Sequence, residues 1–443
     1  MLVTSLNSLS ELAEYLRKLS NKYEGELIFQ EESEEFAEDL PIASEELSLQ
    51  SSHRGIVKIK RSETISSNIF FKYFIDGVVE TRPIKKIRVR GVEVPIHLAI
   101  CGAGVFERTD EGEIRPTNNM IFLSFIAFPY SALKDLDKNI DQPSVINLNK
   151  FKPLIDKLQR EIPGVLWLDT SISFGTGRRV IEKEDLLKTG YIRAKARDQA
   201  SVIMRILEIG VLYLLKKSTY NGLIAFDGPI SPLYIYAKLV SDEIQGLFEL
   251  SDKDVSYNML KDVIGCIKRV YKVPLDDTIY TIFEQKIDEQ AFIIYPMSGV
   301  IKSLRDEDES SLEDAIRVTL SAFTVLRPEL RWVHREKIVS NTSMITRFDI
   351  PLPNISERNE YWYQSDFIEE IFKEIFPNGF INLSSNRSKK LYEILKAITA
   401  ERCPIPPAHG TKIYTELYPI HEAELWLKSY VKKLLVNTLP NLF

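Results

Sequence analysis

The pattern of apolar and polar residues divides the chain into a helical start, an acidic stretch and a long region of strands and helices. The stretch 31–46 is rich in glutamate, which is typical of a solvated linker, although a partner-docking arm is the alternative. Before it, leucines at helical spacing predict an amphipathic helix: Leu9, Leu12, Leu16 and Leu19. After it, from residue 55, five β-type runs predict a mostly antiparallel sheet: GIVKIKR, NIFFKYFIDG, KKIRVRGVEV, HLAICGAGVFE and NMIFLSFIAF.

Helical periodicity dominates after residue 149 and alternates with further strand patterns. A helix is expected at 149–161, followed by a buried strand VLWLD and a glycine-containing turn FGTG. Later helices are expected at 193–217, 233–247, 255–270, 363–376, 389–400 and 422–435, with the strand GLIAFDG between the first two. This alternation predicts a mixed α/β fold, and no internal repeat is detectable.

Charge and cysteine content narrow the class of protein. The chain has 57 Lys and Arg residues against 63 Asp and Glu residues, a net charge of −6, which excludes a uniformly basic nucleic-acid coat. Its three cysteines lie too far apart in sequence for a disulfide framework or a four-cysteine zinc site, which favours a reducing compartment. The N-terminus does not resemble a signal peptide, and the longest uncharged run is too short to span a bilayer. We therefore expect a soluble, cytoplasmic protein without membrane contact.

Two predicted strands end on an aspartate followed by glycine, at Asp76-Gly77 and at Asp227-Gly228. Each carboxylate would stand at the end of the sheet, where the glycine lets the backbone turn sharply. Since Asp-Gly is also a common turn dipeptide, a plain turn is the alternative at each place. A third carboxylate, on the helix that precedes Asp227, favours a functional role for the two aspartates over a plain turn.

Glu208 is the single charge in the apolar decamer ILEIGVLYLL, on a helix that is expected to be buried nearly all round. A buried glutamate needs a partner, because removing an unpaired charge from water is costly. Arg205 on the same helical face would supply an internal salt bridge; a metal ion shared with Asp76 and Asp227 is the alternative. Two strand aspartates and one helix glutamate suit Mg²⁺ or Mn²⁺, which can activate water for phosphodiester hydrolysis. The carboxylates therefore predict a nuclease in which water is the nucleophile.

In their order along the chain, these segments resemble the NurA family, prokaryotic nucleases with a ribonuclease-H-like core that process DNA ends with a HerA-type hexameric ATPase. The resemblance implies a ribonuclease-H-like mixed sheet flanked by helices, a homodimer, and Mn²⁺-dependent cleavage of DNA, 5′ to 3′ from ends and within single strands, in double-strand break resection and repair. Residues 1–54 would be a helical arm and acidic linker, and residues 55–443 one nuclease domain with a helical insertion around 150–197. The matching segments are IDG at Asp76, the apolar helix with Glu208, FDG at Asp227, IGCIKR around Lys268, RFDIP at 347–351 and a late motif with proline and histidine.

The sequence departs from the family pattern at several positions. Val78 and Pro229 stand where a serine usually follows Asp-Gly, so a hydroxyl contact is missing there. The late motif is split: CPIPPAHG carries His409, whereas LYPIHEAE carries His421 and has Glu424 where the histidine should fall. His409 is the favoured metal ligand or proton-transfer residue, with His421 as its rival; a surface or capping histidine is the alternative for both.

Basic and aromatic residues supply candidate DNA contacts. Lys268 and Arg269, on a predicted helix, would face phosphate or simply complement the helix dipole at its C-terminus. Arg347 would contact the DNA backbone or pair within its own surroundings. The aromatic segment 361–363 would stack on unpaired bases or pack a helix, and the apolar run 314–326 would bury a dimer interface or the core.

Two functions of different class follow from these residues. The first is a divalent-metal-dependent deoxyribonuclease that uses Asp76, Glu208, Asp227 and a histidine. The second is a NurA-like adaptor whose altered motifs keep the fold and the surface for a hexameric ATPase without cutting DNA; an unrelated α/β enzyme ranks below both. No motor activity is expected, because spaced glycines ending in Gly-Lys-Ser/Thr are absent from the sequence.

Overall fold

The structure is a computed structural model of the 443-residue chain. It describes residues 2–3, 14, 17–18, 21–23, 26–27, 54–66, 69–141, 146–150, 166–230, 233, 236, 239–240, 253–268, 280–283, 285–286, 288–296, 318–326, 345–357, 367–401 and 417–438. Several predicted features lie outside these residues: most of the N-terminal helix and of the 233–247 helix, the acidic stretch, His409, Arg269 and the aromatic segment 361–363.

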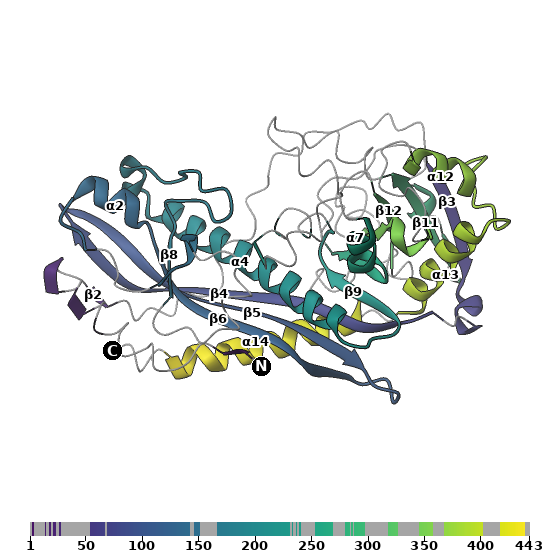
Figure 1. Cartoon of the computed structure of the whole chain (residues 1–443), viewed down its shortest axis with the longest axis horizontal. Helices are drawn as coiled ribbons and strands as arrows, with labels where there is room; N and C mark the ends of the chain where they lie inside the picture. Colours follow the sequence, from purple (N-terminus) through teal and green to yellow (C-terminus); the bar gives the residue numbers. More distant parts are fainter. Residues whose placement is uncertain are drawn as a thin grey trace.

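One large mixed sheet organises the described chain (Figure 1). Its thirteen strands in the described residues are β1 (Leu2–Val3), β2 (Glu26–Leu27), β3 (Gly55–Lys60), β4 (Phe71–Val89), β5 (Val92–Arg108), β6 (Ile114–Phe128), β7 (Ile146–Asn147), β8 (Leu166–Asp169), β9 (Leu223–Asp227), β10 (Val263–Ile267), β11 (Glu289–Pro296), β12 (Thr319–Thr324) and β13 (Thr346–Pro351). They run in the order β3-β11-β12-β13-β10-β9-β4-β5-β6-β8-β7, with β1 beside β6 and β2 beside β4. Strands β4, β5 and β6 form an antiparallel meander, whereas β9 is parallel to β4 and β10 is parallel to β9. The predicted mixed α/β fold is confirmed.

The meander strands are longer than the sequence pattern predicted. The runs FKYFIDG and KKIRV belong to a single strand, β4, because the irregularity at Pro83–Lys85 shifts its register against β5 without ending the pairing. Arg90 and Gly91 then make the turn into β5 with φ angles of 49° and 84°, and two such positive angles suit a two-residue hairpin turn.

The prediction that Asp76-Gly77 ends a strand is wrong. Both residues lie inside β4, where Asp76 pairs with Gly104 and Gly77 with Ala103 of β5. The strand continues because β5 provides a hydrogen-bonding partner along its whole length. A strand does end at this level of the sheet, but it is the neighbouring strand β9.

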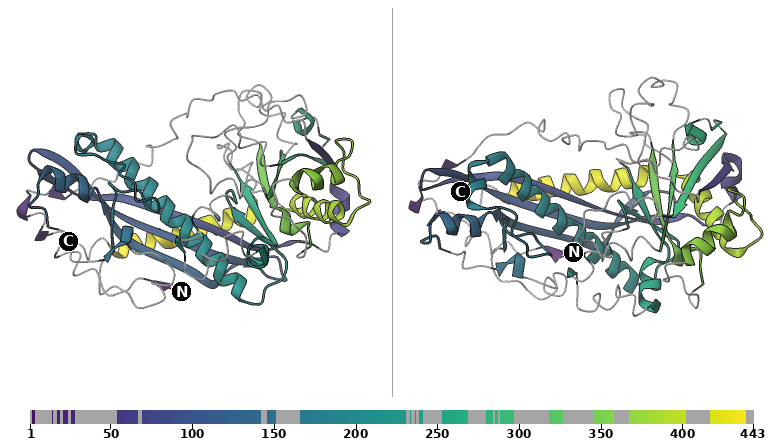
Figure 2. Two further views of the ribbon diagram at one scale, coloured as in Figure 1. Left: turned by 45° about the horizontal axis from the view of Figure 1, so that its top comes forward. Right: turned by 90° about the horizontal axis from the view of Figure 1, so that it is seen from above.

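Two long helices cover opposite faces of the meander, α4 (Thr189–Lys217) in front and α14 (Tyr418–Thr438) behind (Figures 1 and 2). A Cβ atom on Gly77 would meet Met204 of α4, whereas one on Gly102 would come within 3.4 Å of Val431 of α14. The predicted helices at 193–217, 389–400 and 422–435 are confirmed within a few residues. The other helices with bounds in the described residues are α2 (Tyr130–Leu136), α7 (Lys253–Leu260), α8 (Tyr280–Phe283), α12 (Phe367–Ile375) and α13 (Asn386–Ala400), with short 3₁₀ turns at 61–66, 148–150, 183–187 and 352–354.

The predicted helix 255–270 is correct only in its first half. Helix α7 ends at Leu260, and Asp262 takes a positive φ of 65° before the chain enters β10. All five residues of β10, the run VIGCI, are buried between β9 and β13, and such an apolar, β-branched run fits a strand covered on both faces. Lys268 therefore follows a strand, so the helix-dipole role that its predicted helix suggested does not apply.

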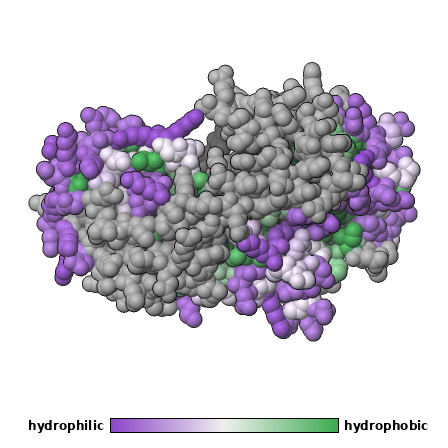
Figure 3. Space-filling view, viewed as in Figure 1, coloured by the Kyte–Doolittle hydropathy of each residue, from purple (hydrophilic) through white to green (hydrophobic). Residues whose placement is uncertain are grey.

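The described part of the apolar run 314–326, residues 318–326, contributes to the core. Its strand β12 lies between β11 and β13, and all six residues of β12 are buried. None of the described helices is long and apolar enough to cross a membrane. The described surface visible in Figure 3 is largely hydrophilic at both ends of the molecule.

Candidate functional site

Asp76 and Asp227 are adjacent on neighbouring parallel strands. Ile75 of β4 pairs with Phe226 of β9, so each aspartate is the next residue beyond that pair. Strand β9 ends at Asp227, as predicted, and Gly228 turns the chain with a φ of +100°, a conformation that favours glycine. The Gly228 amide donates a hydrogen bond of 2.8 Å to a carbonyl oxygen of β10, which fixes this turn beside the sheet.

Asp76 faces the side of the sheet that α14 covers. Successive side chains of a strand point to opposite faces, and the face of Gly77 lies against α4. Phe74, on the same face as Asp76, pairs with Phe106, whose ring packs edge-on against Trp426 of α14 at 5.7 Å between centroids. The aspartate therefore points towards the α14 side.

Lys268 connects the sheet to α14 through two carboxylates. Its Nζ lies 3.3 Å from Oδ1 of Asp227 and 3.3 Å from Oε2 of Glu424, near the start of α14. The other oxygen of Glu424 lies 2.6 Å from Nζ of Lys428, one turn further along the helix. Burial acts to raise the pKa of Glu424, but Lys268 and Lys428 outweigh it and lower that pKa to about 2. Glu424 is therefore ionised at neutral pH.

Asp76 is buried, with 1% of its surface exposed, and only one of its oxygens is hydrogen-bonded within the described part of the chain. Oδ1 accepts a bond of 2.7 Å from the Gly77 amide, whereas Oδ2 has no donor among the described residues. Burial first, and then the charge of Asp227, raise the pKa of Asp76 well above its usual range, and Lys268 opposes them. A buried oxygen without a donor is costly, so this position calls for a proton on the carboxyl group, for a cation, or for a donor that the described chain does not supply.

Glu208 makes the internal salt bridge that the sequence offered as one alternative. One guanidinium nitrogen of Arg205 lies 2.9 and 2.7 Å from the two carboxylate oxygens, and the same nitrogen donates to the carbonyl oxygen of Asp227 at 2.9 Å. Burial raises the pKa of Glu208 to about 7 against the opposing charge of Arg205. Glu208 lies directly against Gly77, where a Cβ atom would stand 2.6 Å from its Oε1. The absence of a side chain at Gly77 is therefore what lets this carboxylate reach the sheet.

The three carboxylates predicted to share one metal ion do not converge. Among the described residues, no three His, Cys, Asp or Glu side chains are grouped closely enough to hold a metal ion. The alternation of faces along β4 explains the difference, because Glu208 packs on the Gly77 side while Asp76 faces the other. On the α14 side, Asp76 has an oxygen without a donor among the described residues, Asp227 lies beside it, and Glu424 is joined to Asp227 through Lys268, but these three carboxylates do not form such a group either. Carboxylate oxygens are the ligands that Mg²⁺ and Mn²⁺ prefer.

Two further candidates lie in the described chain. His421 is in the first turn of α14, three residues before Glu424, and so on a similar side of the helix. Arg347, on β13, donates to the buried carboxylate of Asp349 at 3.2 Å, which also accepts a bond of 3.0 Å from the Ser321 hydroxyl. Arg347 thus pairs within its own surroundings, the alternative to a DNA contact.

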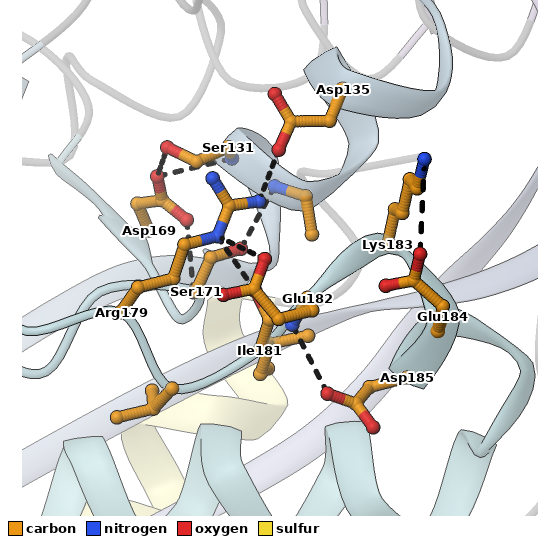
Figure 4. Close-up of polar contacts among 12 residues, drawn as sticks. Ser131, Asp135, Asp169, Ser171, Arg179, Ile181, Glu182, Lys183, Glu184 and Asp185 are labelled. Carbon is orange, nitrogen blue, oxygen red and sulfur yellow. Dashed lines mark hydrogen bonds and ion pairs between the residues drawn. The ribbon is translucent and has the colours of Figure 1, made fainter.

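Asp169, at the end of β8, shows what a structural carboxylate looks like in this protein (Figure 4). One of its oxygens accepts from the amide and the hydroxyl of Ser131, and the other accepts from the Ser171 amide at 3.0 Å. Arg179 beside it is paired with Asp135. Asp169 is as deeply buried as Asp76, yet both of its oxygens have donors. The missing donor at Asp76 is therefore not a general feature of buried strand aspartates here.

Glu424 is the site residue that sequence reasoning did not assign. A signal for it was present, because it stands where the family pattern has a histidine, but a lone glutamate on an amphipathic helix gives no reason to expect contact with the sheet. Only the packing of α14 across β4 brings it to Lys268.

Comparisons with known proteins add no functional evidence to this geometry. No protein-family model matches the chain, and no curated protein matches it. The resemblance to NurA therefore rests on the short motifs and their order.

Proposed function

We propose that this protein is a divalent-cation-dependent nuclease that hydrolyses phosphodiester bonds of DNA. The observation that carries the proposal is Oδ2 of Asp76, a buried oxygen without a donor in the described residues, beside the carboxylates that Lys268 bridges. A buried polar oxygen that lacks a partner is destabilising, which favours a functional role for Asp76. Asp76, Asp227 and Glu424 would hold Mn²⁺ or Mg²⁺.

The strand order supports a ribonuclease-H-like core. The sequence β6-β5-β4-β9-β10 consists of three antiparallel strands followed by two that run parallel to the first of them, β4. Helix α4 lies between the meander and β9 along the chain. This order puts Asp76 of β4 beside Asp227 of β9, as expected for carboxylates that share a cation.

A cation bound here would act as a Lewis acid, neutralising phosphate charge and favouring ionisation of an attacking water. Residues of the chain would supply the contact with the phosphate and hold the carboxylates in place. Lys268 Nζ offers a positive charge to a non-bridging phosphate oxygen. Arg205 holds Glu208 and the carbonyl oxygen of Asp227 together, which fixes the end of β9 and the position of the Asp227 carboxylate.

The motif order extends the proposal beyond the site. It supports a NurA-like enzyme that resects double-strand breaks from 5′ ends and cuts single strands in the cytoplasm, as a homodimer with a HerA-type hexameric ATPase. His409 and Arg269 stay candidates for proton transfer and phosphate contact, and His421 is the alternative to His409.

One observation favours the adaptor as a second candidate. Lys268 already neutralises part of the charge of Asp227 and Glu424, and Val78 and Pro229 replace the expected hydroxyl residues. A protein of this kind would dock the ATPase without cutting DNA.

Cleavage assays separate the two candidates. Purified protein is incubated with single-stranded and blunt duplex DNA in Mn²⁺ or in EDTA, together with Asp227→Asn and, as a matched control, Asp198→Asn on the exposed side of α4. The nuclease cuts in Mn²⁺ only, loses activity in Asp227→Asn and keeps it in Asp198→Asn. Cutting that survives EDTA and Asp227→Asn contradicts the nuclease as drawn, whereas folded protein that never cuts in Mn²⁺ supports the adaptor.

A further inference from the structure

We infer that Asp349 is a positioning residue for Asp227: its buried carboxylate anchors the segment 228–230 that follows β9, and so keeps the Asp227 side chain in its place on the α14 side of the sheet. The inference rests on the proposed function, in which Asp227 takes part in DNA cleavage. It gives the ion pair of Arg347 and Asp349 a role beyond the packing of β13.

The Asp349 carboxylate is fully buried, and both of its oxygens have partners. Oδ2 accepts a hydrogen bond of 3.3 Å from the Ile230 amide and one of 3.2 Å from a guanidinium nitrogen of Arg347. Oδ1 lies 3.0 Å from Nε of Arg347 and accepts from the Ser321 hydroxyl at 3.0 Å. Arg347 contacts both oxygens and thus orients the carboxylate, whose remaining bond reaches the chain beyond β9.

Gly265 makes room for this contact. It lies in β10 and pairs with Asp349 of β13. A Cβ atom on Gly265 would stand 2.9 Å from the Gly228 carbonyl oxygen and 3.0 Å from Cγ1 of Ile230. Any side chain at this position would therefore push the segment 228–230 away from the sheet and out of reach of the carboxylate.

The segment 228–230 is held at both ends by groups that lie outside it. The Gly228 amide donates to a carbonyl oxygen of β10 at 2.8 Å. Pro229 has no amide hydrogen, so the next donor of the segment is the Ile230 amide, which Asp349 accepts. Both amide hydrogens of the segment are thus bound, and the backbone directly after Asp227 is fixed.

Asp227 and Asp349 lie on opposite faces of the sheet. Asp227 pairs with Cys266 of β10 and Asp349 pairs with Gly265, and neighbouring residues of a strand point to opposite faces. Asp349 can therefore act on the Asp227 carboxylate only through the backbone. A buried ion pair gives a fold little stability compared with apolar side chains of similar size, so stability alone does not explain the pair at Asp349.

Hydrogen exchange, read residue by residue with fragmentation mass spectrometry, tests the anchor without DNA. In wild type the Ile230 amide should exchange about 100-fold or more slowly than a free amide, as expected for a buried hydrogen bond. Exchange should become about tenfold faster in Asp349→Asn, which replaces one acceptor oxygen, and in Gly265→Ala, which displaces the segment. Ser321→Ala is the matched control, because Arg347 still contacts both oxygens, and Ile230 exchange should stay within about twofold of wild type.

Cleavage kinetics of the same three variants show whether the anchor serves Asp227. On single-stranded DNA in Mn²⁺, kcat should fall about 10- to 100-fold in Asp349→Asn and Gly265→Ala with KM nearly unchanged, because a displaced carboxylate impairs the chemical step more than substrate binding. Ser321→Ala should keep wild-type kinetics. A purely structural role would lower the stability of the variants and leave kcat of the folded protein unchanged.

The outcomes separate the inference from the proposed function. An Ile230 amide that exchanges freely in wild type, or equally fast in wild type and Asp349→Asn, overturns the anchor. Faster Ile230 exchange with unchanged kcat in Asp349→Asn and Gly265→Ala overturns the positioning of Asp227 and leaves the nuclease intact. Wild-type protein that never cuts DNA, while Ile230 exchange responds as predicted, supports the anchor and overturns the proposed function.

Discussion

Asp76 and Asp227 stand one register step beyond the Ile75–Phe226 pair, so two parallel strands deliver their carboxylates to the same point of the sheet. Only one of these strands ends there. Since β4 runs on, Asp76 stays buried in the sheet, while Asp227 lies at the open end of β9. This asymmetry sets the different surroundings of the two carboxylates.

Replacement of Glu424 tests whether α14 completes the site. Glu424→Gln removes a charge that lies 3.3 Å from Lys268, and we expect Mn²⁺ affinity and cleavage to fall about 10- to 100-fold. Glu424→His should retain part of both, because imidazole is also a ligand for Mn²⁺. The control is Glu422→Gln on the same helix, which should leave both quantities within about twofold. Equal activity in Glu424→Gln and wild type would place Glu424 outside the site.

Gly77→Ala tests the close approach of α4 to β4. A Cβ atom would stand 2.6 Å from Oε1 of Glu208, so the Arg205–Glu208 pair must shift, and we expect a loss of about 2–3 kcal/mol in the free energy of unfolding. Gly190→Ala on α4 meets nothing within 4 Å and should be neutral or stabilising by up to about 1 kcal/mol. Urea denaturation measures both, and similar values for the two variants would contradict the packing described.

The role of Glu208 is decided by a double substitution. Arg205→Met leaves a buried glutamate without its partner and should cost about 3–5 kcal/mol, whereas Arg205→Met with Glu208→Leu should recover most of that loss. If Glu208 is structural, the double variant still binds Mn²⁺. A folded double variant that has lost Mn²⁺ binding would instead support the metal role first expected from the sequence.

His97 predicts a pH dependence of stability away from the site. Burial, and then the charge of Arg193, lower the pKa of His97 to about 4. Between pH 6.5 and about 4 the unfolded chain binds a proton at this histidine and the folded chain does not, so acidification favours unfolding. The full effect is about 3 kcal/mol at 1.36 kcal/mol per pKa unit. His97→Leu should show a flatter decline over this window in urea titrations at several pH values; parallel declines would refute this assignment.

Sequence reasoning predicted local features well where one pattern governs them. The buried helix around Glu208, its salt bridge to Arg205 as one alternative, and the strand end at Asp227-Gly228 all depend on residues close in sequence. Sequence reasoning failed where pairing with a strand distant in the sequence determines the local structure. Asp76-Gly77 was predicted to end a strand because the dipeptide carries no information about the pairing with β5. The run VIGCI was predicted to be helical because its burial between β9 and β13 is a tertiary property.

For the same reason, only part of the candidate site was predicted from the sequence. Asp76 and Asp227 were found from the shared strand pattern, and Lys268 from its basic character. The side of the sheet to which each carboxylate points follows from strand alternation and from the packing of α4 and α14, which the sequence alone did not provide. Glu208 was therefore grouped with the aspartates, and Glu424 was left out.

The central claim, that carboxylates on the α14 side hold a cation for DNA cleavage, is tested most directly by cleavage of single-stranded DNA as Mn²⁺ is titrated against wild type and Asp227→Asn. We predict cleavage that rises with Mn²⁺, stops in EDTA and is lost in Asp227→Asn while that variant stays folded. Cleavage that continues unchanged in EDTA and in Asp227→Asn would contradict the account.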